Sequence, residues 1–288
     1  MKWMKFRILF FAISLLFLIP GIFSLIKFGL KPSIDFSGGS LLELSVPKEI
    51  DSSKIEQTVE EAGFIFSSIQ SSGDNSFLLK LEPIKREDVN LIISSFEEEG
   101  ISELRFETVG PTLGQELIKK TIWAIILAAG FIMAYVAWQF KNAKFGICAI
   151  LAMFHDTFIL LGSFSLLGHF LGVEVDTLFV TAVLTILSFS VHDTVVVYDR
   201  IRESQKFASK DDFEQIANKA VTETLPRSLN NSLTIIFMLV ALLLLGGQSI
   251  KFFTAALLIG TISGTYSSTF TAVPFLVVWT KIEEKKKS

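Results

Sequence analysis

Residues 177–203 read TLFVTAVLTILSFSVHDTVVVYDRIRE, a long apolar run that ends in a cluster of charged side chains. An apolar run of about 20 residues is long enough to cross a bilayer as a helix. His192 and Asp193 lie inside this run, before the charged residues that end it. A carboxylate inside a bilayer costs about 2.5–3.5 kcal/mol on insertion scales, so this pair indicates a functional site.

The composition also indicates a membrane protein. Half of the 288 residues are hydrophobic, 28 are Phe, and the mean hydropathy is +0.54. The single cysteine, Cys148, excludes an intrachain disulfide and a thiolate metal cluster. Basic residues precede the apolar run 8–26, which is long enough to span and is not followed by a small-residue cleavage site. We therefore expect an uncleaved membrane anchor at the N-terminus.

Six stretches have the length and hydropathy of a transmembrane helix. They are residues 8–28, 121–139, 146–168, 177–198, 229–246 and 253–279. The sequence therefore predicts an α-helical membrane protein with one span, a polar domain, and then five further spans. The predicted divisions are 1–30 for the N-terminal end and first span, 31–118 for the polar domain, 119–280 for the five-helix membrane domain, and 281–288 for a basic tail.

Basic residues in the short loops predict the orientation of the chain. They occur before the first span, between spans two and three, in the segment 199–227 and in the tail. The loops on the other side contain few, with none in 169–176 and only Lys251 in 247–252. We therefore expect both termini in the cytoplasm and the polar domain in the periplasm.

The polar stretch 31–118 has the pattern of a small α+β domain. It holds 17 Asp and Glu against 7 Lys and Arg, so it is strongly acidic. Alternating and helical apolar patterns predict a strand at 41–46, a helix at 52–62, strands at 65–70 and 75–82 joined by a turn at Gly73–Asp74, a helix at 86–99 and a strand at 101–109. This β-α-β-β-α-β order predicts a ferredoxin-like domain. The stretch contains no phosphate-binding loop, metal-ligand spacing or nucleophile elbow.

Five motifs resemble those of the SecF family, in the order found in that family. They are IDFSGGSLLEL (34–44), VGPTLGQEL (109–117), MFHDT (153–157), SVHDTVVVYDRIRE (190–203) and TLPRSLNNSLT (224–234). SecF is the smaller of the two SecDF subunits of the bacterial protein-export machinery, within the resistance–nodulation–division superfamily. Together with the one-plus-five pattern of spans, the resemblance covers the whole chain.

The resemblance implies a function and a set of partners. The chain would use the proton-motive force, together with SecD as a separate chain, to promote translocation of unfolded secretory polypeptides through the SecYEG channel. The expected location is the bacterial inner membrane. YajC and YidC are further partners that the resemblance implies. We expect no nucleic-acid partner, no cofactor and no enzymatic reaction, because the implied motion is mechanical.

The resemblance places the family's proton-relay aspartate at Asp193. The alternative is a carboxylate solvated near the cytoplasmic interface, because Asp199 and Arg200 follow after about 9 Å of helix. A neutral–charged cycle at a buried carboxylate can favour one helix packing over another. Arg227, which follows Pro226 at the predicted start of span five, is the implied partner of Asp193. The alternative for Arg227 is a positive-inside anchor.

Two histidines adjoin aspartates in the predicted spans. His192 stands where the SecF pattern has Asn, so it is either a second proton carrier, since an unperturbed His titrates near pH about 6.5, or a replacement for a neutral amide. His155 and Asp156 lie near the middle of span three and are either a structural hydrogen-bonding pair or part of the relay. We expect no metal site, because adjacent residues of a helix diverge and no ligand-spacing motif occurs.

Glycines mark two further features. Gly38 and Gly39 follow span one and suit either a tight turn or a hinge, and the resemblance favours a functional joint. Gly260 and Gly264, with Ser268 and Ala272, form a small-residue face on span six, which is typical of close helix packing within the chain or against SecD.

The segment 199–227 has charges of both signs around Phe213, Ile216 and Ala220. We expect it to form a cytoplasmic amphipathic helix that lies at the membrane surface.

Three other functions remain open from the sequence. The chain could be half of a transporter for lipids or small molecules from the same superfamily, although its short single half argues against this. It could be a non-conducting scaffold for SecD, or an intramembrane enzyme built on the two His-Asp pairs.

Overall fold

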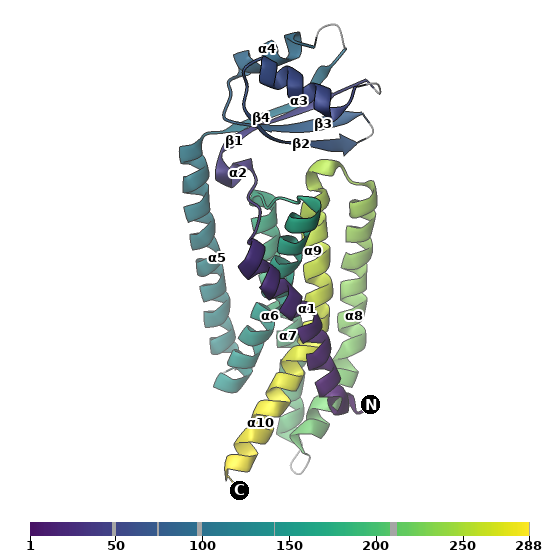
Figure 1. The fold of residues 1–288 in the computed structure, drawn as a ribbon. Coiled ribbons are helices and arrows are strands. Elements are labelled where there is room, and N and C mark those ends of the chain that lie inside the picture. Colours follow the sequence, from purple (N-terminus) through teal and green to yellow (C-terminus); the bar gives the residue numbers. More distant parts are fainter. Residues whose placement is uncertain (48–49, 74, 97–99, 141, 208–211, 288) are drawn as a thin grey trace. The chain divides into compact units, whose positions relative to one another are not determined.

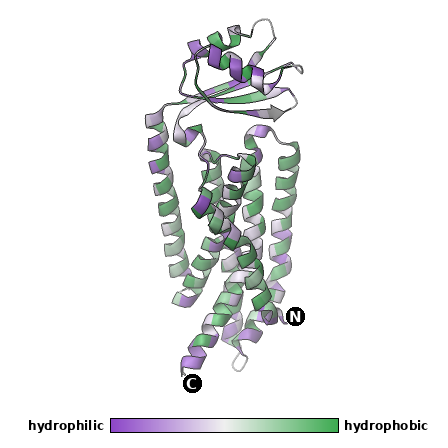
Figure 2. Ribbon diagram, viewed as in Figure 1, coloured by the Kyte–Doolittle hydropathy of each residue, from purple (hydrophilic) through white to green (hydrophobic). Residues whose placement is uncertain are grey.

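The computed structural model describes residues 1–47, 50–73, 75–96, 100–140, 142–207 and 212–287 (Figure 1). The chain forms two compact units. The helical unit consists of Met1–Lys31 and Ala124–Ser288, and the sheet unit consists of Pro32–Trp123. Hydrophobic residues dominate the long helices of the helical unit, whereas the sheet unit contains both hydrophobic and hydrophilic residues (Figure 2).

The helical unit contains long helices joined by short connections. The long helices are α1 (Arg7–Phe28), the larger part of α5 (Pro111–Phe140), α6 (Ala143–Leu171), α7 (Thr177–Phe207), α8 (Phe213–Leu245), α9 (Gln248–Ser267) and α10 (Val273–Lys287). A short 3₁₀ helix, η1 (Trp3–Phe6), precedes α1, and a π-helical segment, η3 (Ser268–Ala272), joins α9 to α10. Among the described residues, five helices are long and apolar enough to cross a membrane. They confirm the first five predicted spans. The sixth, 253–279, falls on α9, η3 and α10 and stays a prediction.

Local sequence signals determine several helix ends. α5 begins at Pro111, ten residues before the predicted span, because proline favours the first position of a helix. The Asn142 side chain accepts a hydrogen bond from the Lys144 amide at the start of α6, and Gly172 ends that helix in a left-handed conformation. Asp212 caps α8 in the same way as Asn142 caps α6.

α6 and α7 form the buried centre of the helical unit. About half of the most apolar part of each helix is buried, namely 56% and 50%, against 6% for α5. Apolar side chains of α6, α7, α9 and α10 join in one core with the first half of α8. Polar side chains on the buried faces of α6 and α7, such as Asp156 and Ser190, are therefore inaccessible to solvent, whereas α5 shows most of its surface.

Glycines allow two pairs of helices to approach closely. A Cβ on Gly162 of α6 would lie 2.5 Å from the Cα of Gly21 in α1, and Ser24 and Ser165 hydrogen-bond beside this crossing at 2.7 Å. A Cβ on Gly260 of α9 would lie 2.3 Å from Ile186 of α7. The small-residue face predicted on span six, including Gly264, thus packs within the chain against α7.

The prediction of one amphipathic surface helix at 199–227 is wrong. The end of α7 and the first half of α8 share this segment, and residues 208–211 lie outside the described part. The apolar positions of the α8 half, including Phe213, Ile216 and Ala220, are buried in the core. Pro226 lies inside α8 and does not break it at the predicted start of a span.

Among its described residues, the sheet unit contains four strands, all paired antiparallel. The strands are β1 (Gly39–Ser45), β2 (Phe66–Gly73), β3 (Ser76–Leu81) and β4 (Ser102–Val109), in the order β2-β3-β1-β4. Helix α3 (Ser52–Glu61) follows β1, and helix α4 (Arg86–Ser94) follows β3. All six predicted elements are present, and the short α2 (Ile34–Ser37) is an addition. Asp74 of the predicted turn and residues 97–99 of the predicted helix lie outside the described residues.

The sheet unit has its own core, separate from that of the helices. Leu42 and Leu44 of β1 and Leu79 of β3 pack with Ile55 of α3 and Ile92 of α4, and all five are essentially inaccessible to solvent. Alternate residues of the strands enter this core, as a two-residue period requires.

Gly38 and Gly39 form a tight turn between α2 and β1. Their φ angles are 74° and 130°, which L side chains rarely adopt. A Cβ on Gly38 would lie 2.9 Å from the Cα of Pro111, and one on Gly39 would lie 2.9 Å from the Leu81 carbonyl oxygen. The turn therefore packs directly on the start of α5 and on β3. Its use as a hinge stays a prediction.

We predict that Gly162→Ala lowers the free energy of unfolding by about 1–3 kcal/mol, because its methyl group has no room against α1. Gly130→Ala is the matched control, since Gly130 is also inside a helix and a Cβ there meets no other atom within 4 Å. Thermal unfolding of the full chain in detergent measures both. Equal unfolding midpoints for the two variants would contradict the close α1–α6 crossing.

We also predict that Gly38→Ala destabilises the chain by at least about 1–2 kcal/mol, because the backbone is left-handed and the methyl group meets Pro111. Gly110→Ala is the control, because Gly110 has open space and no positive φ. Protease resistance of the full chain, followed at the sheet unit, reports the difference. Wild-type resistance in Gly38→Ala would rule out the tight-turn requirement.

Candidate functional site

The carboxyl group of Asp156 joins three helices in the buried centre of the helical unit. It accepts hydrogen bonds from Ser190 of α7 at 2.6 Å, from Ser263 of α9 at 2.6 Å and from Ser267 of α9 at 2.5 Å. Asp156 is fully buried in α6, and the three serines are at most 7% exposed. We call these four residues the serine cluster.

His155 adjoins the serine cluster from within α6. Its Nδ1 lies 3.0 Å from Oδ1 of Asp156, and the side chain is buried. Among the described residues, no group hydrogen-bonds to its Nε2. The predicted His155–Asp156 pair is therefore in contact, and it connects to α7 and α9 through hydroxyl groups. Whether the pair takes part in a relay stays a prediction.

Asp193 lies on α7 and is 6% exposed. Its Oδ2 accepts a hydrogen bond of 2.7 Å from Ser228 of α8. Ser190 of the serine cluster precedes it by three residues, so the two carboxyl groups attach to the same stretch of α7. Movement of α7 would therefore affect Asp156 and Asp193 together.

Arg227 does not contact Asp193 in this structure. Within the described part of the chain it forms no ion pair, and its side chain is exposed, with Asp199, Glu203 and Lys206 around the same groove. Arg227 is nevertheless the neighbour of Ser228, which does bind Asp193. The structure thus pairs Asp193 with Ser228, the residue that follows the predicted partner Arg227.

His192 is exposed on α7, directly before Asp193 in the sequence. It lines a cavity of about 300 Å³ between α5 and α7, together with Phe131, Tyr135 and Val195. Within the described part of the chain, His192 makes no hydrogen bond to Asp193, Ser228 or the serine cluster. Its part in the relay stays a prediction.

No group of three or more His, Cys, Asp or Glu side chains in the described ranges has an arrangement that could hold a metal ion. Serine hydroxyls and one imidazole surround Asp156, and one serine hydroxyl binds Asp193. These groups can transfer or bind protons and can hold helices together.

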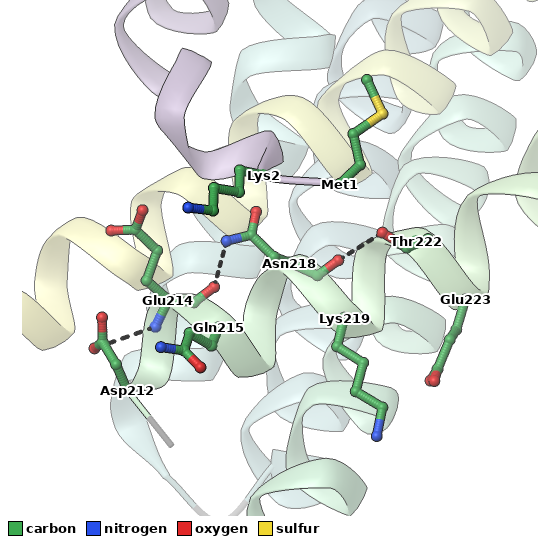
Figure 3. A pocket seen from close by; sticks show the side chains of 9 residues that line it. All are labelled: Met1, Lys2, Asp212, Glu214, Gln215, Asn218, Lys219, Thr222 and Glu223. Carbon is green, nitrogen blue, oxygen red and sulfur yellow. Dashed lines mark hydrogen bonds between the residues drawn. The ribbon is translucent and has the colours of Figure 1, made fainter.

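Polar contacts also attach the N-terminus to the start of α8. A groove of about 690 Å³ is lined by Met1, Lys2, the capping residue Asp212 and residues of that helix. Figure 3 shows these side chains. Along one face of α8, Glu214 binds Arg7 at 3.1 Å, Asn218 accepts from the Met4 amide at 2.9 Å, and Thr222 accepts from Trp3 at 3.0 Å.

Glu214 also binds Lys281 of α10. The first half of α8 is therefore connected to both chain ends of the helical unit.

Sequence reasoning found the two aspartates but missed their serine partners. Ser190 and Ser228 stand inside the recognised motifs, three residues before Asp193 and one after Arg227. Ser263 and Ser267 are spaced by four residues, which places them on one face of α9. Two serines four residues apart in an apolar helix could have indicated a polar contact with another helix.

The apolar helices and their buried carboxyl groups define the chain as a multi-pass membrane protein. Two family models match it, namely the C-terminal part of the protein export membrane proteins SecD/SecF over residues 90–282 and the SecD/SecF GG motif over residues 23–46. The SecF translocase subunit of Thermobaculum terrenum is 41% identical, covering 96% of this chain and 92% of that protein. The SecF subunit of Synechocystis is 36% identical, covering 89% and 85%.

Solved structures agree with these relatives. SecDF from Thermus thermophilus superposes with a TM-score of 0.87 at 33% identity, covering 98% of this chain and 39% of that one. SecDF in its super-membrane-facing form gives 0.72 at 31% identity, covering 100% and 40%. The chain thus spans about two fifths of these SecDF structures.

The chain belongs to the SecF family of Sec protein-export translocase subunits, which confirms the resemblance seen in the sequence. The alternative of a transporter for lipids or small molecules is not favoured by these relatives.

We predict that Asp156→Ala lowers the free energy of unfolding by about 3–5 kcal/mol, because three buried hydroxyl groups lose the Asp156 carboxylate, and among the described residues only Ser267 has another acceptor, the Gly264 carbonyl. Asp156→Asn keeps one acceptor oxygen and should lose less. Ser163→Ala is the control, since that hydroxyl donates only to a carbonyl of its own helix. Thermal unfolding in detergent measures all three. If Asp156→Ala is no less stable than Ser163→Ala, the serine cluster does not hold the helices together.

Proposed function

We propose that the chain uses the proton-motive force, with SecD as a separate chain, to promote the export of unfolded secretory polypeptides. The observation that carries this proposal is the hydrogen bond between the buried Asp193 of α7 and the half-buried Ser228 of α8. An ionisable group inside apolar helices is costly and is most often functional. Because Asp193 contacts Ser228 on a second helix, a change in the charge of Asp193 can alter how α7 and α8 pack.

Asp193 would act as the proton-binding group. When its carboxyl group is charged, it attracts the guanidinium of Arg227, which can turn inward from the groove beside Ser228. Proton binding removes that attraction and adds an O–H donor. The two states therefore favour different contacts between α7 and α8, which is the requirement for a ligand to shift a conformational equilibrium.

The first half of α8 would transmit this change. Pro226 lacks the N–H that would complete the helical ladder, so α8 can bend two residues before Ser228. In the part of α8 that precedes Pro226, Glu214, Asn218 and Thr222 form hydrogen bonds with residues near the N-terminus. A change at Asp193 would thus move a segment that is attached to α1 and α10.

The proposed arrangement in the membrane has six spans, with α9, η3 and α10 together forming the sixth. The bacterial inner membrane would hold the chain with both termini in the cytoplasm and the sheet unit in the periplasm. The strand order β2-β3-β1-β4 and the element order support a ferredoxin-like domain. This acidic unit would contact or follow the exported polypeptide, with Gly38 and Gly39 at its joint with the membrane part.

SecD is the first partner that we propose, because the fused SecDF proteins of Thermus thermophilus and Bacillus subtilis match this chain over only 35% and 38% of their own length. SecYEG, YajC and YidC are proposed from the family alone. No bond-making reaction, cofactor or nucleic acid enters the proposed mechanism. Scaffolding of SecD without proton coupling remains the competing proposal.

We predict that Asp193→Asn abolishes the part of export that depends on the proton-motive force. Ser228→Ala should reduce that part about fivefold, because the loss of one hydrogen bond is worth about 1 kcal/mol. The measurement is translocation of a secretory precursor into inverted vesicles containing SecD and this chain, with and without a proton gradient.

Ser232→Ala is the matched control, since Ser232 lies on α8 one turn beyond Ser228, is buried, and its hydroxyl has no partner among the described residues. It should export like wild type. If Asp193→Asn and Arg227→Ala both keep gradient-dependent export, the proton relay is excluded and scaffolding is favoured.

A further inference from the structure

A cavity of about 360 Å³ lies between α1, α6 and α9 in the helical unit. Its walls are formed by Ile13, Ser14, Phe17, Ile159, Ser163, Ile259, Ile262, Ser263 and Tyr266. α1 and α6 are both helices that can cross a membrane. The cavity therefore belongs to the part of the protein that faces lipid, and no predicted site residue lines it.

Two sets of contacts explain why the helices leave this space. At one end, the close approach of Gly21 and Gly162 holds α1 against α6. At the other end, Ser14 hydrogen-bonds Thr271 at 3.2 Å, and Tyr266 donates to the Phe10 carbonyl at 2.7 Å. Between these contacts, α1 cannot collapse onto α6 and α9 without breaking one of them. The cavity is thus fixed by the packing at both ends.

The hydroxyl groups in the cavity wall all have partners within the protein. Ser14 pairs with Thr271, Ser163 donates to the Ile159 carbonyl, and Tyr266 donates to the Phe10 carbonyl. Ser263 donates to Asp156. No charged side chain lines the cavity. An occupant consequently meets no charged group and no hydroxyl without a partner, and most of the wall is apolar, so the cavity suits an apolar molecule.

The edge of the cavity is apolar and open toward the outside of the bundle. Phe17 is 60% exposed and Ile262 is 51% exposed. In a membrane, these side chains contact lipid tails. An apolar cavity of about 150 Å³ can stay dry and bind a molecule of the size of benzene, and cavities above about 300 Å³ accommodate larger ligands. At about 360 Å³, this cavity is large enough for a ligand bigger than benzene.

We propose that this cavity binds an acyl chain of a membrane phospholipid. The bilayer supplies that chain at high concentration beside Phe17 and Ile262, and the cavity walls match its chemistry. The bound chain packs against Ser263, whose hydroxyl donates to Asp156. Acyl-chain binding therefore supports the serine cluster from one side and stabilises the packing of α9 on α6.

The test is lipid binding to the purified full-length chain after removal of bound lipid with detergent. Native mass spectrometry counts retained lipid while palmitoyl-oleoyl-phosphatidylglycerol is added, and thermal unfolding follows the same titration. Ile259→Phe fills the cavity. Because each methylene group excluded from an apolar site weakens binding by roughly fourfold, we expect at least about tenfold more lipid for half-maximal stabilisation.

Leu127→Phe is the matched control, since Leu127 is an aliphatic residue exposed on α5, away from the cavity. It should bind lipid like wild type. Ser163→Leu fills the cavity from α6 and replaces Ile259→Phe if that variant does not fold. Glycerophosphoglycerol, which has the headgroup without acyl chains, should neither bind nor stabilise.

The proposal is overturned if the cavity-filling variants and Leu127→Phe retain lipid equally. It is also overturned if glycerophosphoglycerol stabilises as well as the phospholipid, because the headgroup would then be the recognised part. Export activity is not needed for this test, so its result is independent of the proton relay.

Discussion

The carboxyl group of Asp156 is the contact on which the packing of the helical unit depends. It accepts hydrogen bonds from three serines on two other helices, inside a core from which solvent is excluded. A buried carboxyl group without such donors would cost several kcal/mol, and three buried hydroxyl groups without an acceptor would cost more. α6, α7 and α9 are therefore held in one relative arrangement by polar groups, while the glycines at their crossings provide the close approach that the short serine side chains require.

The second buried carboxyl group, Asp193, differs in the number of groups that hold it. One serine of α8 binds it, and the cationic side chain nearest in sequence to that serine is exposed in a groove. A carboxyl group with one donor can change partners at a smaller cost than one with three. This difference explains why we place the switch at Asp193 and the fixed joint at Asp156, although the sequence presents both as the same His-Asp motif in an apolar helix.

The sequence predicted those features that depend on composition and period. Hydropathy alone located five spans, and the alternating pattern located all four strands, because these signals come from many residues at once. The serine partners of Asp156 could not be predicted, since serine is common in membrane helices and its partner depends on how three helices pack. The burial of Phe213 and Ile216 was missed for a related reason: an amphipathic face looks the same whether a membrane surface or neighbouring helices cover it.

α7 connects the fixed and the changeable part of the helical unit. Ser190 attaches it to Asp156, Asp193 attaches it to α8 three residues later, and Tyr198 donates to the carbonyl of Ala272 in the π-helical segment at 2.7 Å. π-helical turns often occur where a helix must adapt at a functional site. Since the first of these contacts resists movement and the second can exchange partners, a proton at Asp193 would tilt α8 against a stationary α6–α7–α9 core. On the proposed function, α8 would be the part that moves, and the contacts of Asp156 would keep α6, α7 and α9 in place.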